Sequence, residues 1–313
     1  MRVSIIVPVY KVERYVERCL QSVTAQTYED IECICVNDGT PDNSFEVVKR
    51  FVAEHGSENK KISFILVEHD QNKGLSEARN TGIRQASGDY VFFLDSDDAL
   101  PPNAVSSLVA SAIDNGLPDI VYGHTIAINN NGERAFFEPD DMSSFTDEKS
   151  ILVGRLNNTW PGIACNKLVK RSLFIEKGIW FSPGLLHEDE LWCFEVSTVI
   201  ETLIYCPNVT YIYYIGDTDS ISRRGASEKD FRDNITILER KLSYMDKVCA
   251  PEELAQNVYN LSYLFYLSLV RLHFPRPFRK ECHKRLAAII KAARKSGYGS
   301  LHTRWYARLA WML

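Results

Sequence analysis

Short apolar runs alternate with amphipathic, helix-like runs through the first 128 residues, and this alternation constrains the fold more than any other feature of the sequence. Strand-like apolar runs lie at residues 3–7, 31–36, 62–67, 90–94 and 120–128. Apolar side chains recur at helical spacing between them, at residues 12–26, 44–55, 76–86 and 103–115. Strands that are apolar on both faces are typical of a parallel sheet with helices on each side. We therefore predict an α/β fold built on a mostly parallel sheet.

The pattern is weaker beyond residue 128. Residues 129–160 are polar and rich in turn-forming residues, so we expect a hairpin and a flexible excursion there. Shorter elements follow, namely a strand at 165–169, helices at 172–177 and 188–199, and one or two strands within 205–215. A helical pattern begins at residue 228 and continues to residue 313. We predict a domain boundary near residue 225, between a first domain (1–225) and a helical region (226–313).

The cysteines and the hydropathy predict a cytoplasmic protein. None of the eight cysteines belongs to a CxxC pair or a zinc-finger spacing, and most lie in apolar runs, which favours reduced thiols. No secretory signal opens the sequence, and no run reaches the roughly 18 to 20 apolar residues of a membrane-spanning helix. We therefore expect that the chain does not cross a membrane by itself.

Three carboxylates follow the fourth apolar run, in Phe-Leu-Asp-Ser-Asp-Asp at residues 93–98. Side chains at i and i+2 of an extended segment share a face, so Asp95 and Asp97 can converge. Their hard oxygens suit Mg²⁺ or Mn²⁺, with a diphosphate and water completing the coordination. A helix N-cap would also use an aspartate here, but one would suffice. Because three clustered acids repel one another without a cation, we favour a metal site over a cap.

Two more polar segments lie where predicted strands end, which is the edge at which α/β sheets bind ligands. Asp38, in the turn Asn-Asp-Gly-Thr at residues 37–40, could accept a hydrogen bond from a base or a ribose there, although such turns also form without a ligand. Arg79 lies in Asn-Lys-Gly-Leu-Ser-Glu-Ala-Arg-Asn-Thr-Gly at residues 72–82 and offers a forked donor to a diphosphate or a base carbonyl. The alternative is an arginine on the solvated face of an amphipathic helix.

A further acidic segment, Leu-His-Glu-Asp-Glu-Leu-Trp at residues 186–192, opens a predicted helix. A carboxylate at a helix start is well placed to act as a general base if it faces a reacting group. Acids in the first helical turn also stabilise the helix dipole without doing chemistry. The spacing alone does not separate these two interpretations.

Together these segments resemble the inverting GT-A glycosyltransferases of family 2. The resemblance covers residues 3–98 through SIIVPVYKVERYVERCLQSV, VNDGTPDNS, NKGLSEARNTG and FLDSDD, in the family's order and spacing. It continues more weakly to about residue 222, where Asn166-Lys167 and HEDELW resemble the family's NK pair and ED motif. It implies a Rossmann-like GT-A domain over 1–225, with a nucleotide-sugar half (1–128) and an acceptor half (129–225).

The resemblance also implies a nucleotide-sugar site, lined by Pro8, Val9, Tyr10, Asp38, Arg79, Asp95, Ser96 and Asp97. Asp38 would face the base, usually uracil, and Arg79 would help to hold the nucleotide. Asp95 would meet the ribose or the diphosphate, and Asp97 would bind Mn²⁺ or Mg²⁺. Lys11 departs from the family, which often has asparagine at that position.

On the acceptor side, the resemblance implies that Asp189 is the catalytic base, with Glu188 as the alternative. Asn166, Lys167 and His187 would lie near the acceptor. The chain lacks the QxxRW signature of processive polymerases, so we expect the addition of a single sugar.

The predicted activity is therefore transfer of a sugar, with inversion, from a nucleotide diphosphate to a hydroxyl of a glycan or lipid-linked glycan. UDP-sugars are the favoured donors. The alternatives are a sugar-1-phosphate nucleotidyltransferase and a non-catalytic sugar-nucleotide-binding protein. The turn at residues 9–13 lacks the glycine that a nucleotidyltransferase phosphate loop would need, and the acids at 38, 95, 97 and 189 speak against a decayed site.

The C-terminal segment is strongly basic. Residues 271–313 contain eleven Lys or Arg and one acid, although the whole chain has a net charge of −5. Basic and aromatic residues interleave through 275–313, which suits an anionic membrane surface at the inner face of the membrane. The alternative is a helix that packs against the body of the chain or against a second subunit in a homodimer. No nucleic-acid-binding module accompanies the basic residues, so we predict no nucleic-acid partner.

Overall fold

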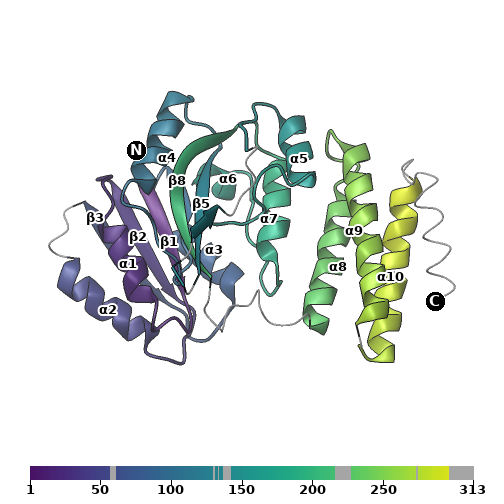
Figure 1. Cartoon of the computed structure of the whole chain (residues 1–313), viewed down its shortest axis with the longest axis horizontal. Helices are drawn as coiled ribbons and strands as arrows, with labels where there is room; N and C mark the ends of the chain where they lie inside the picture. Colours follow the sequence, from purple (N-terminus) through teal and green to yellow (C-terminus); the bar gives the residue numbers. More distant parts are fainter. Residues whose placement is uncertain are drawn as a thin grey trace. The chain divides into compact units, whose positions relative to one another are not determined.

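A computed structural model describes residues 1–56, 61–129, 131–132, 134–136, 142–215, 227–272 and 274–295. The chain divides into two compact units (Figure 1). The first contains Met1–Ile151 and Thr159–Thr218, and the second contains Leu152–Asn158 and Asp219–Leu313. The boundary that the sequence predicts near residue 225 lies outside the described residues.

The first unit is built on one sheet. Its described strands are β1 (Val3–Val9), β2 (Ile31–Asn37), β3 (Ile62–Glu68), β4 (Tyr90–Phe93), β5 (Ile120–Asn129), β6 (Arg134–Phe136), β7 (Lys167–Lys170) and β8 (Leu203–Ile215). Strands β3, β2, β1 and β4 are neighbours in that order and run parallel. Strand β7 joins β4 and β5 by antiparallel pairing, and β6 is also antiparallel to β5. Strands β5 and β8 are parallel and lie side by side (Figure 1).

Before β8, the described residues contain seven helices: α1 (Val16–Thr24), α2 (Ser44–His55), α3 (Leu75–Gln85), α4 (Ala104–Asp114), α5 (Glu148–Leu156), α6 (Ser172–Ile175) and α7 (Glu188–Ser197). Helix α1 buries one apolar face, and it lies beside α2. Helix α3 packs on β1 and β2. Gly82 allows this close approach, since a Cβ at that position would lie 2.3 Å from Cγ2 of Ile6. The predicted α/β fold is confirmed.

One local prediction needs correction. The polar segment 129–160 contains the predicted hairpin as the β5–β6 pair, but it also contains helix α5, where an irregular excursion is predicted. Ile151 and Leu152 of α5 are buried, and Trp160 Nε1 donates to the Ile151 carbonyl at 3.0 Å. Burial of this short apolar face therefore outweighs the turn-forming residues that precede it. Of the one or two strands predicted within residues 205–215, the structure has one continuous strand, β8, which pairs along the length of β5.

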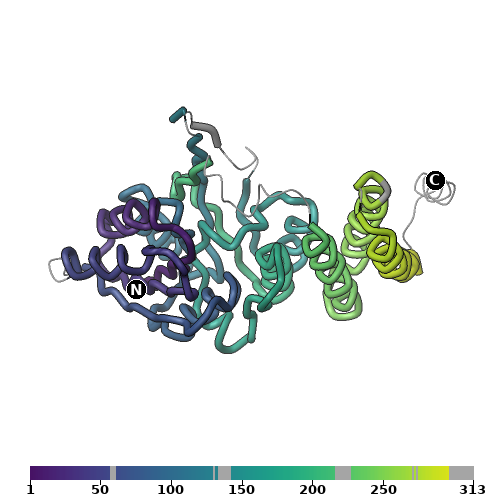
Figure 2. The backbone as a smooth tube through the Cα atoms, turned by 90° about the horizontal axis from the view of Figure 1, so that it is seen from below, coloured from purple at the N-terminus to yellow at the C-terminus, as the bar shows by residue number. Residues whose placement is uncertain are grey.

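The second unit contains α8 (Glu228–Ser243), α9 (Pro251–Arg271) and α10 (Arg276–Lys295), which lie side by side (Figure 2). A reciprocal capping box between Ser227 and Asp230 begins α8. Helix α10 buries Phe278, Leu286 and Ile289 within the unit. Their burial fits the alternative in which this segment packs against the chain itself, and membrane contact stays a prediction. Residues 296–313 lie outside the described residues. In the part of the chain that the structure describes, no helix combines the length and the hydropathy needed to span a bilayer.

Candidate functional site

Three polar turns meet at one edge of the sheet because β1, β2 and β4 are parallel and end on the same side. Tyr10 follows β1, Asp38 follows β2, and Asp95 follows β4 by way of Leu94. Leu94 extends the ladder by donating its amide to the Ile6 carbonyl at 3.0 Å. The carboxyl edge predicted from the strand pattern therefore gathers the side chains predicted to bind the nucleotide sugar.

Arg79 connects this edge to the acids of α7. Its Nη2 donates to Asp95 Oδ1 at 3.1 Å, and its Nη1 donates to Glu188 Oε1 at 2.8 Å. The arginine side chain is only 3% exposed, so the guanidinium is not on a solvated helix face. Burial alone would lower the pKa of Arg79, but the charges of Asp95 and the other nearby acids raise it above its ordinary value. Arg79 is therefore a permanent buried cation shared by two carboxylates.

Local packing explains why α7 begins next to Arg79. Asn80 and Phe181 exchange two hydrogen bonds, from Nδ2 of Asn80 to the Phe181 carbonyl at 2.8 Å and from the Phe181 amide to Oδ1 of Asn80 at 3.0 Å. The Phe181 ring stacks on Trp192 of α7 with centroids 4.9 Å apart, and it meets Phe93 edge-on at 5.2 Å. This aromatic cluster fixes the start of α7 against the end of β4.

The two acids that open α7 differ in their surroundings. Glu188 is 8% exposed and is paired with Arg79, whereas Asp189 is partly exposed and accepts the Glu190 amide on Oδ1 at 2.8 Å. Burial raises the pKa of both carboxyls, and the charge of Arg79 partly opposes the increase. A carboxyl with a raised pKa is a better proton acceptor when ionised. Asp189 can play that part without giving up a salt bridge.

Asp38 is held by several bonds within the chain. It is 3% exposed, and both of its carboxylate oxygens have partners. Oδ1 meets His69 Nδ1 and the Lys73 amide, each at 2.8 Å, and Oδ2 accepts from Asn72 Nδ2 at 2.9 Å and from the Gly74 amide at 2.8 Å. These bonds hold the segment that leads into α3. A contact between Asp38 and a base stays a prediction.

Tyr10 is the exposed member of the first turn. Its side chain is 39% exposed, while Pro8 and Val9 are buried within β1 and Ser96 is 6% exposed. Pro8, Val9 and Ser96 can therefore shape the site only through the backbone. Tyr10 offers an exposed aromatic face directly after β1, which suits stacking on a nucleobase.

The residues predicted near the acceptor are mostly internal. Asn166 is 3% exposed and donates to the Gly123 carbonyl at 2.7 Å, and it accepts from the Thr210 hydroxyl at 2.5 Å. Lys167 is 1% exposed, with Nζ 2.5 Å from the Ile163 carbonyl. Asn166 therefore links β5 to β8, and Lys167 holds the segment that precedes β7. Both side chains are buried in the chain, and a role near the acceptor stays a prediction. His187 is exposed, and it caps α7 with a positive φ of 60°.

The model of the family described as "Glycosyl transferase family 2" matches residues 4–177, which is more than half of the chain. This chain belongs to glycosyl transferase family 2. The chain is 27% identical over 82% of its length to the glycosyltransferase YibD of Escherichia coli and covers 76% of that protein. It is 29% identical over 68% of its length to a poly(ribitol-phosphate) β-glucosyltransferase of Bacillus spizizenii, of which it covers 32%.

Solved structures of similar fold include two complexes with a nucleotide sugar. S. aureus TarS 1–349 in complex with UDP-GlcNAc superposes with a TM-score of 0.63 at 18% identity, over 95% of this chain and 92% of that chain. The mannosyltransferase PcManGT from Pyrobaculum calidifontis, in complex with GDP-Man and Mn²⁺, gives a TM-score of 0.57 at 18% identity, over 98% and 79% of the two chains. At this identity the likeness shows a shared fold, which confirms the GT-A expectation.

The donor set of the family 2 site fits a divalent cation only in part. Asp95 and Asp97 are both partly exposed, and their carboxylates are hard oxygen ligands of the kind that such a cation prefers. However, the described residues contain no group of three or more side chains able to hold a metal. A cation here would therefore take its remaining ligands from a diphosphate and from water, which is usual for Mg²⁺.

Sequence reasoning missed residues that approach this site from far along the chain. Tyr211 of β8 and Arg18 of α1 both bond the acidic segment 95–98. A tyrosine in a strand and an arginine on an amphipathic helix are ordinary residues in those positions, so no local signal identifies them.

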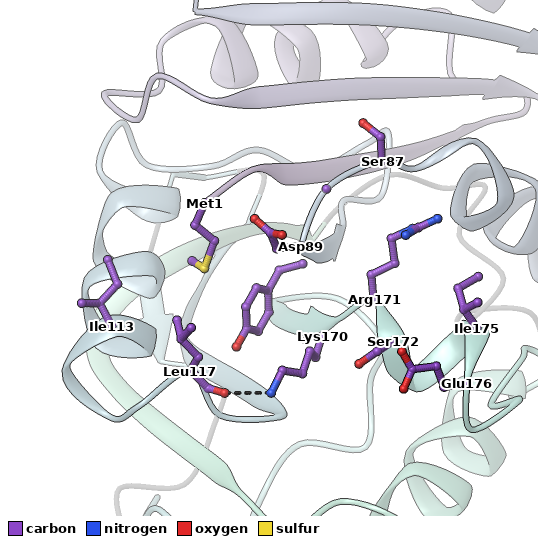
Figure 3. Close-up of a pocket in the computed structure, with 12 residues that line it drawn as sticks. Met1, Ser87, Asp89, Ile113, Leu117, Lys170, Arg171, Ser172, Ile175 and Glu176 are labelled. Carbon is purple, nitrogen blue, oxygen red and sulfur yellow. Dashed lines mark hydrogen bonds between the residues drawn. The ribbon is translucent and has the colours of Figure 1, made fainter.

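A pocket of about 850 Å³ lies elsewhere on the first unit (Figure 3). Met1, Tyr90, Leu117, Lys170 and Arg171 are among its lining residues. Because Tyr90 begins β4 and Lys170 ends the antiparallel β7, the pocket lies at the edge of the sheet opposite to Asp95. It contains none of the predicted site residues.

Proposed function

We propose that this family 2 enzyme is an inverting, metal-dependent glycosyltransferase that moves one sugar from a nucleotide diphosphate to a hydroxyl of a glycan or lipid-linked glycan. The observation that carries the proposal is the buried Arg79, which joins Asp95 at the end of β4 to Glu188 at the start of α7. This link supports one site made of the edge that follows β4 and the start of α7, where the candidate base lies. UDP-sugars are the favoured donors, since the TarS structure contains UDP-GlcNAc. The B. spizizenii relative, named for transfer to poly(ribitol phosphate), supports a polymer acceptor.

Asp189 is the proposed base. The acceptor hydroxyl gives its proton to the Asp189 carboxylate as its oxygen bonds to the anomeric carbon from the side opposite the diphosphate. The bond from that carbon to the diphosphate oxygen breaks, and the electron pair leaves with the nucleotide. Glu188 serves less well as a base because its charge is balanced by Arg79 at 2.8 Å. Its proposed task is to hold Arg79 in place.

On the donor side, Tyr10 stacks on the base and Asp95 contacts the ribose or the diphosphate. Asp97 holds Mn²⁺ or Mg²⁺, which when bound would neutralise the charge that grows on the departing diphosphate. Asp38 contributes indirectly, because it fixes the segment that leads into α3, the helix that carries Arg79. The two donor-side carboxylates are preorganised, since Asp95 is paired with Arg79 and the backbone of Asp97 is held by Arg18.

The first test is thermal stability with UDP, GDP and dTDP, each with and without Mn²⁺. A shift that needs both one nucleotide and the metal is expected, with UDP giving the largest shift. If no pair of nucleotide and metal stabilises the protein, the proposed site does not bind a nucleotide and the proposal fails.

The base assignment is tested separately with Asp189→Asn and Glu188→Gln. Asp189→Asn should bind UDP with Mn²⁺ as tightly as the native protein while turnover falls at least 100-fold, the low end of what a general base contributes. Glu188→Gln should retain more turnover than Asp189→Asn. An Asp189→Asn enzyme that loses sugar-donor affinity and turnover equally would contradict the assignment.

We also propose that the exposed basic face of α10 contacts an anionic membrane surface. Its apolar face is packed inside the helical unit, but six basic side chains are exposed: Arg276, Lys280, Lys284, Lys291, Arg294 and Lys295. Such a contact is electrostatic, so it should weaken steeply with salt. Co-sedimentation with vesicles containing phosphatidylglycerol should decline between about 50 mM and 300 mM salt. Reversal of Lys280, Lys284 and Lys291 to Glu should abolish it, and salt-independent or unchanged partitioning would refute the contact.

A further inference from the structure

The Tyr211 hydroxyl makes hydrogen bonds to both ends of the acidic loop (residues 95–98). Tyr211 of β8 accepts a hydrogen bond from the Asp95 amide at 3.2 Å and donates its own proton to Asp98 Oδ2 at 2.8 Å. Tyr211 is 2% exposed and Asp98 is 3% exposed, so these bonds do not compete with water. One hydroxyl therefore ties the first residue of the acidic loop to the last.

The backbone of β8 continues the same attachment. The Tyr214 amide donates to Asp98 Oδ1 at 3.0 Å, so both oxygens of Asp98 are occupied by β8. Ala99 and Ile212 exchange two backbone hydrogen bonds of 3.1 and 2.9 Å directly after the loop. Asp98 is thus buried against β8, whereas Asp95 is paired with Arg79.

Helix α1 holds the loop from another direction. The Arg18 guanidinium donates to the Asp97 carbonyl, and its Cζ lies 3.5 Å from the centroid of the Tyr214 ring. The stacked ring fixes the plane of the guanidinium, and the guanidinium fixes the Asp97 carbonyl. Arg18 therefore links α1, the acidic loop and β8 at one point.

We propose that Tyr211 and Arg18 are positioning residues that hold the carboxylates of Asp95 and Asp97 in register for the diphosphate and its metal. Neither residue is assigned to touch the substrate. The expected effect of Tyr211 and Arg18 on metal binding rests on the proposed function, because only an enzyme that binds a nucleotide diphosphate needs the two carboxylates in these positions. A displacement of about 1 Å in a preorganised site can lower the rate about 100-fold, so a loop carrying two ligands needs such support.

The direct test of the attachment is amide hydrogen exchange in the native chain and in Tyr211→Phe. This substitution keeps the ring and removes only the hydroxyl that accepts from the Asp95 amide. Exchange at the Asp95 amide should become at least about tenfold faster, as expected for the loss of one buried hydrogen bond. The matched control is Tyr90→Phe, because Tyr90 is equally buried at 2% and its hydroxyl donates to the Pro118 carbonyl at 2.6 Å, at the far end of β4. Unchanged exchange at Asp95 in Tyr211→Phe would overturn the proposal.

The functional test compares the same variants in UDP-dependent thermal shifts at increasing Mn²⁺. Tyr211→Phe and Arg18→Met should each raise the Mn²⁺ concentration for half-maximal shift by about tenfold, whereas Tyr90→Phe should leave it unchanged. An equal shift of the midpoint in Tyr90→Phe would reduce the effect to general destabilisation and refute the positioning role. If the native chain shows no Mn²⁺-dependent response, the proposed function fails, and the exchange experiment still decides whether Tyr211 holds the loop.

Discussion

Replacing Arg79 by methionine removes the cation shared by two carboxylates while keeping much of the side-chain volume. Glu188 would then remain 8% exposed with no positive partner, and breaking a buried pair in this way costs about 3–5 kcal/mol. The Asp95 side chain is 36% exposed, so water screens its charge and its share of the cost is small. We therefore expect Arg79→Met to lower the free energy of unfolding of the first unit by about 3–5 kcal/mol near neutral pH.

If the unpaired Glu188 is the cause, neutralising it should recover stability. The double variant Arg79→Met, Glu188→Gln should be more stable than Arg79→Met by about 1–3 kcal/mol. The loss should also depend on pH. Burial already raises the pKa of Glu188, and without Arg79 the strongest opposing influence on that pKa is lost. A carboxyl with a raised pKa in the folded state stabilises the fold at low pH and loses that contribution as the pH rises through this pKa. The deficit of Arg79→Met relative to the native chain should therefore shrink as the pH is lowered from about 8 toward 5.

Urea unfolding followed by tryptophan fluorescence and circular dichroism measures these differences. Arg84→Met is the matched control, since Arg84 belongs to the same helix and pairs with Glu77 at 2.8 Å but is 50% exposed. It should cost less than about 1 kcal/mol. The reasoning is refuted if Arg79→Met costs no more than Arg84→Met, or if adding Glu188→Gln to Arg79→Met brings no recovery.

Three further predictions concern packing, pH and the metal. Gly82→Ala should destabilise the chain by about 1–3 kcal/mol because its Cβ would meet Ile6 Cγ2, although alanine is normally the better helix former. In an Ile6→Ala background the same change should become neutral or stabilising. Additive effects of the two substitutions on the free energy of unfolding would contradict the contact. Burial raises the pKa of Asp189, and a general base must be ionised to act. As the pH is lowered, kcat/KM should therefore begin to fall at a pH above the ordinary aspartate pKa of about 3.9. A pH–rate profile whose acid limb lies at or below that value would count against Asp189. Asp97→Asn should raise the Mn²⁺ concentration needed for half-maximal turnover at least tenfold, as for loss of a charged ligand, and an unaltered metal titration would remove Asp97 from the site.

The sheet was predictable because burial on both faces leaves a plain signal. Strands such as β1 and β2 are mostly apolar and buried along their whole length, and the apolar residues of the helices between them repeat every 3.6 residues. Helix α5 was not predictable, because its apolar face is short and Gly154 interrupts a nine-residue helix. It forms because tertiary burial supplies what local propensity lacks.

The candidate site was predictable by location and less so by role. Parallel strands that end at one edge bring Tyr10, Asp38 and Asp95 together, whatever each residue does there. The role of Asp38 depends on amide donors from Lys73 and Gly74, which lie 35 and 36 residues away along the chain, and no pattern in the sequence reports where those amides point. The same holds for Arg79, whose helix could equally have turned it toward solvent.

The three acids of the acidic loop have separate tasks, and this changes the reason for expecting a metal. From the sequence, their mutual repulsion appeared to require a cation. In the structure Asp95 is already paired with Arg79, and Asp98 accepts hydrogen bonds from Tyr211 and Tyr214 while burial and the neighbouring charges raise its pKa. The repulsion is therefore relieved inside the chain without a metal. What still calls for a divalent cation at Asp97 is the charge of a departing diphosphate, so metal binding should be weak without nucleotide and strengthen when the nucleotide is present.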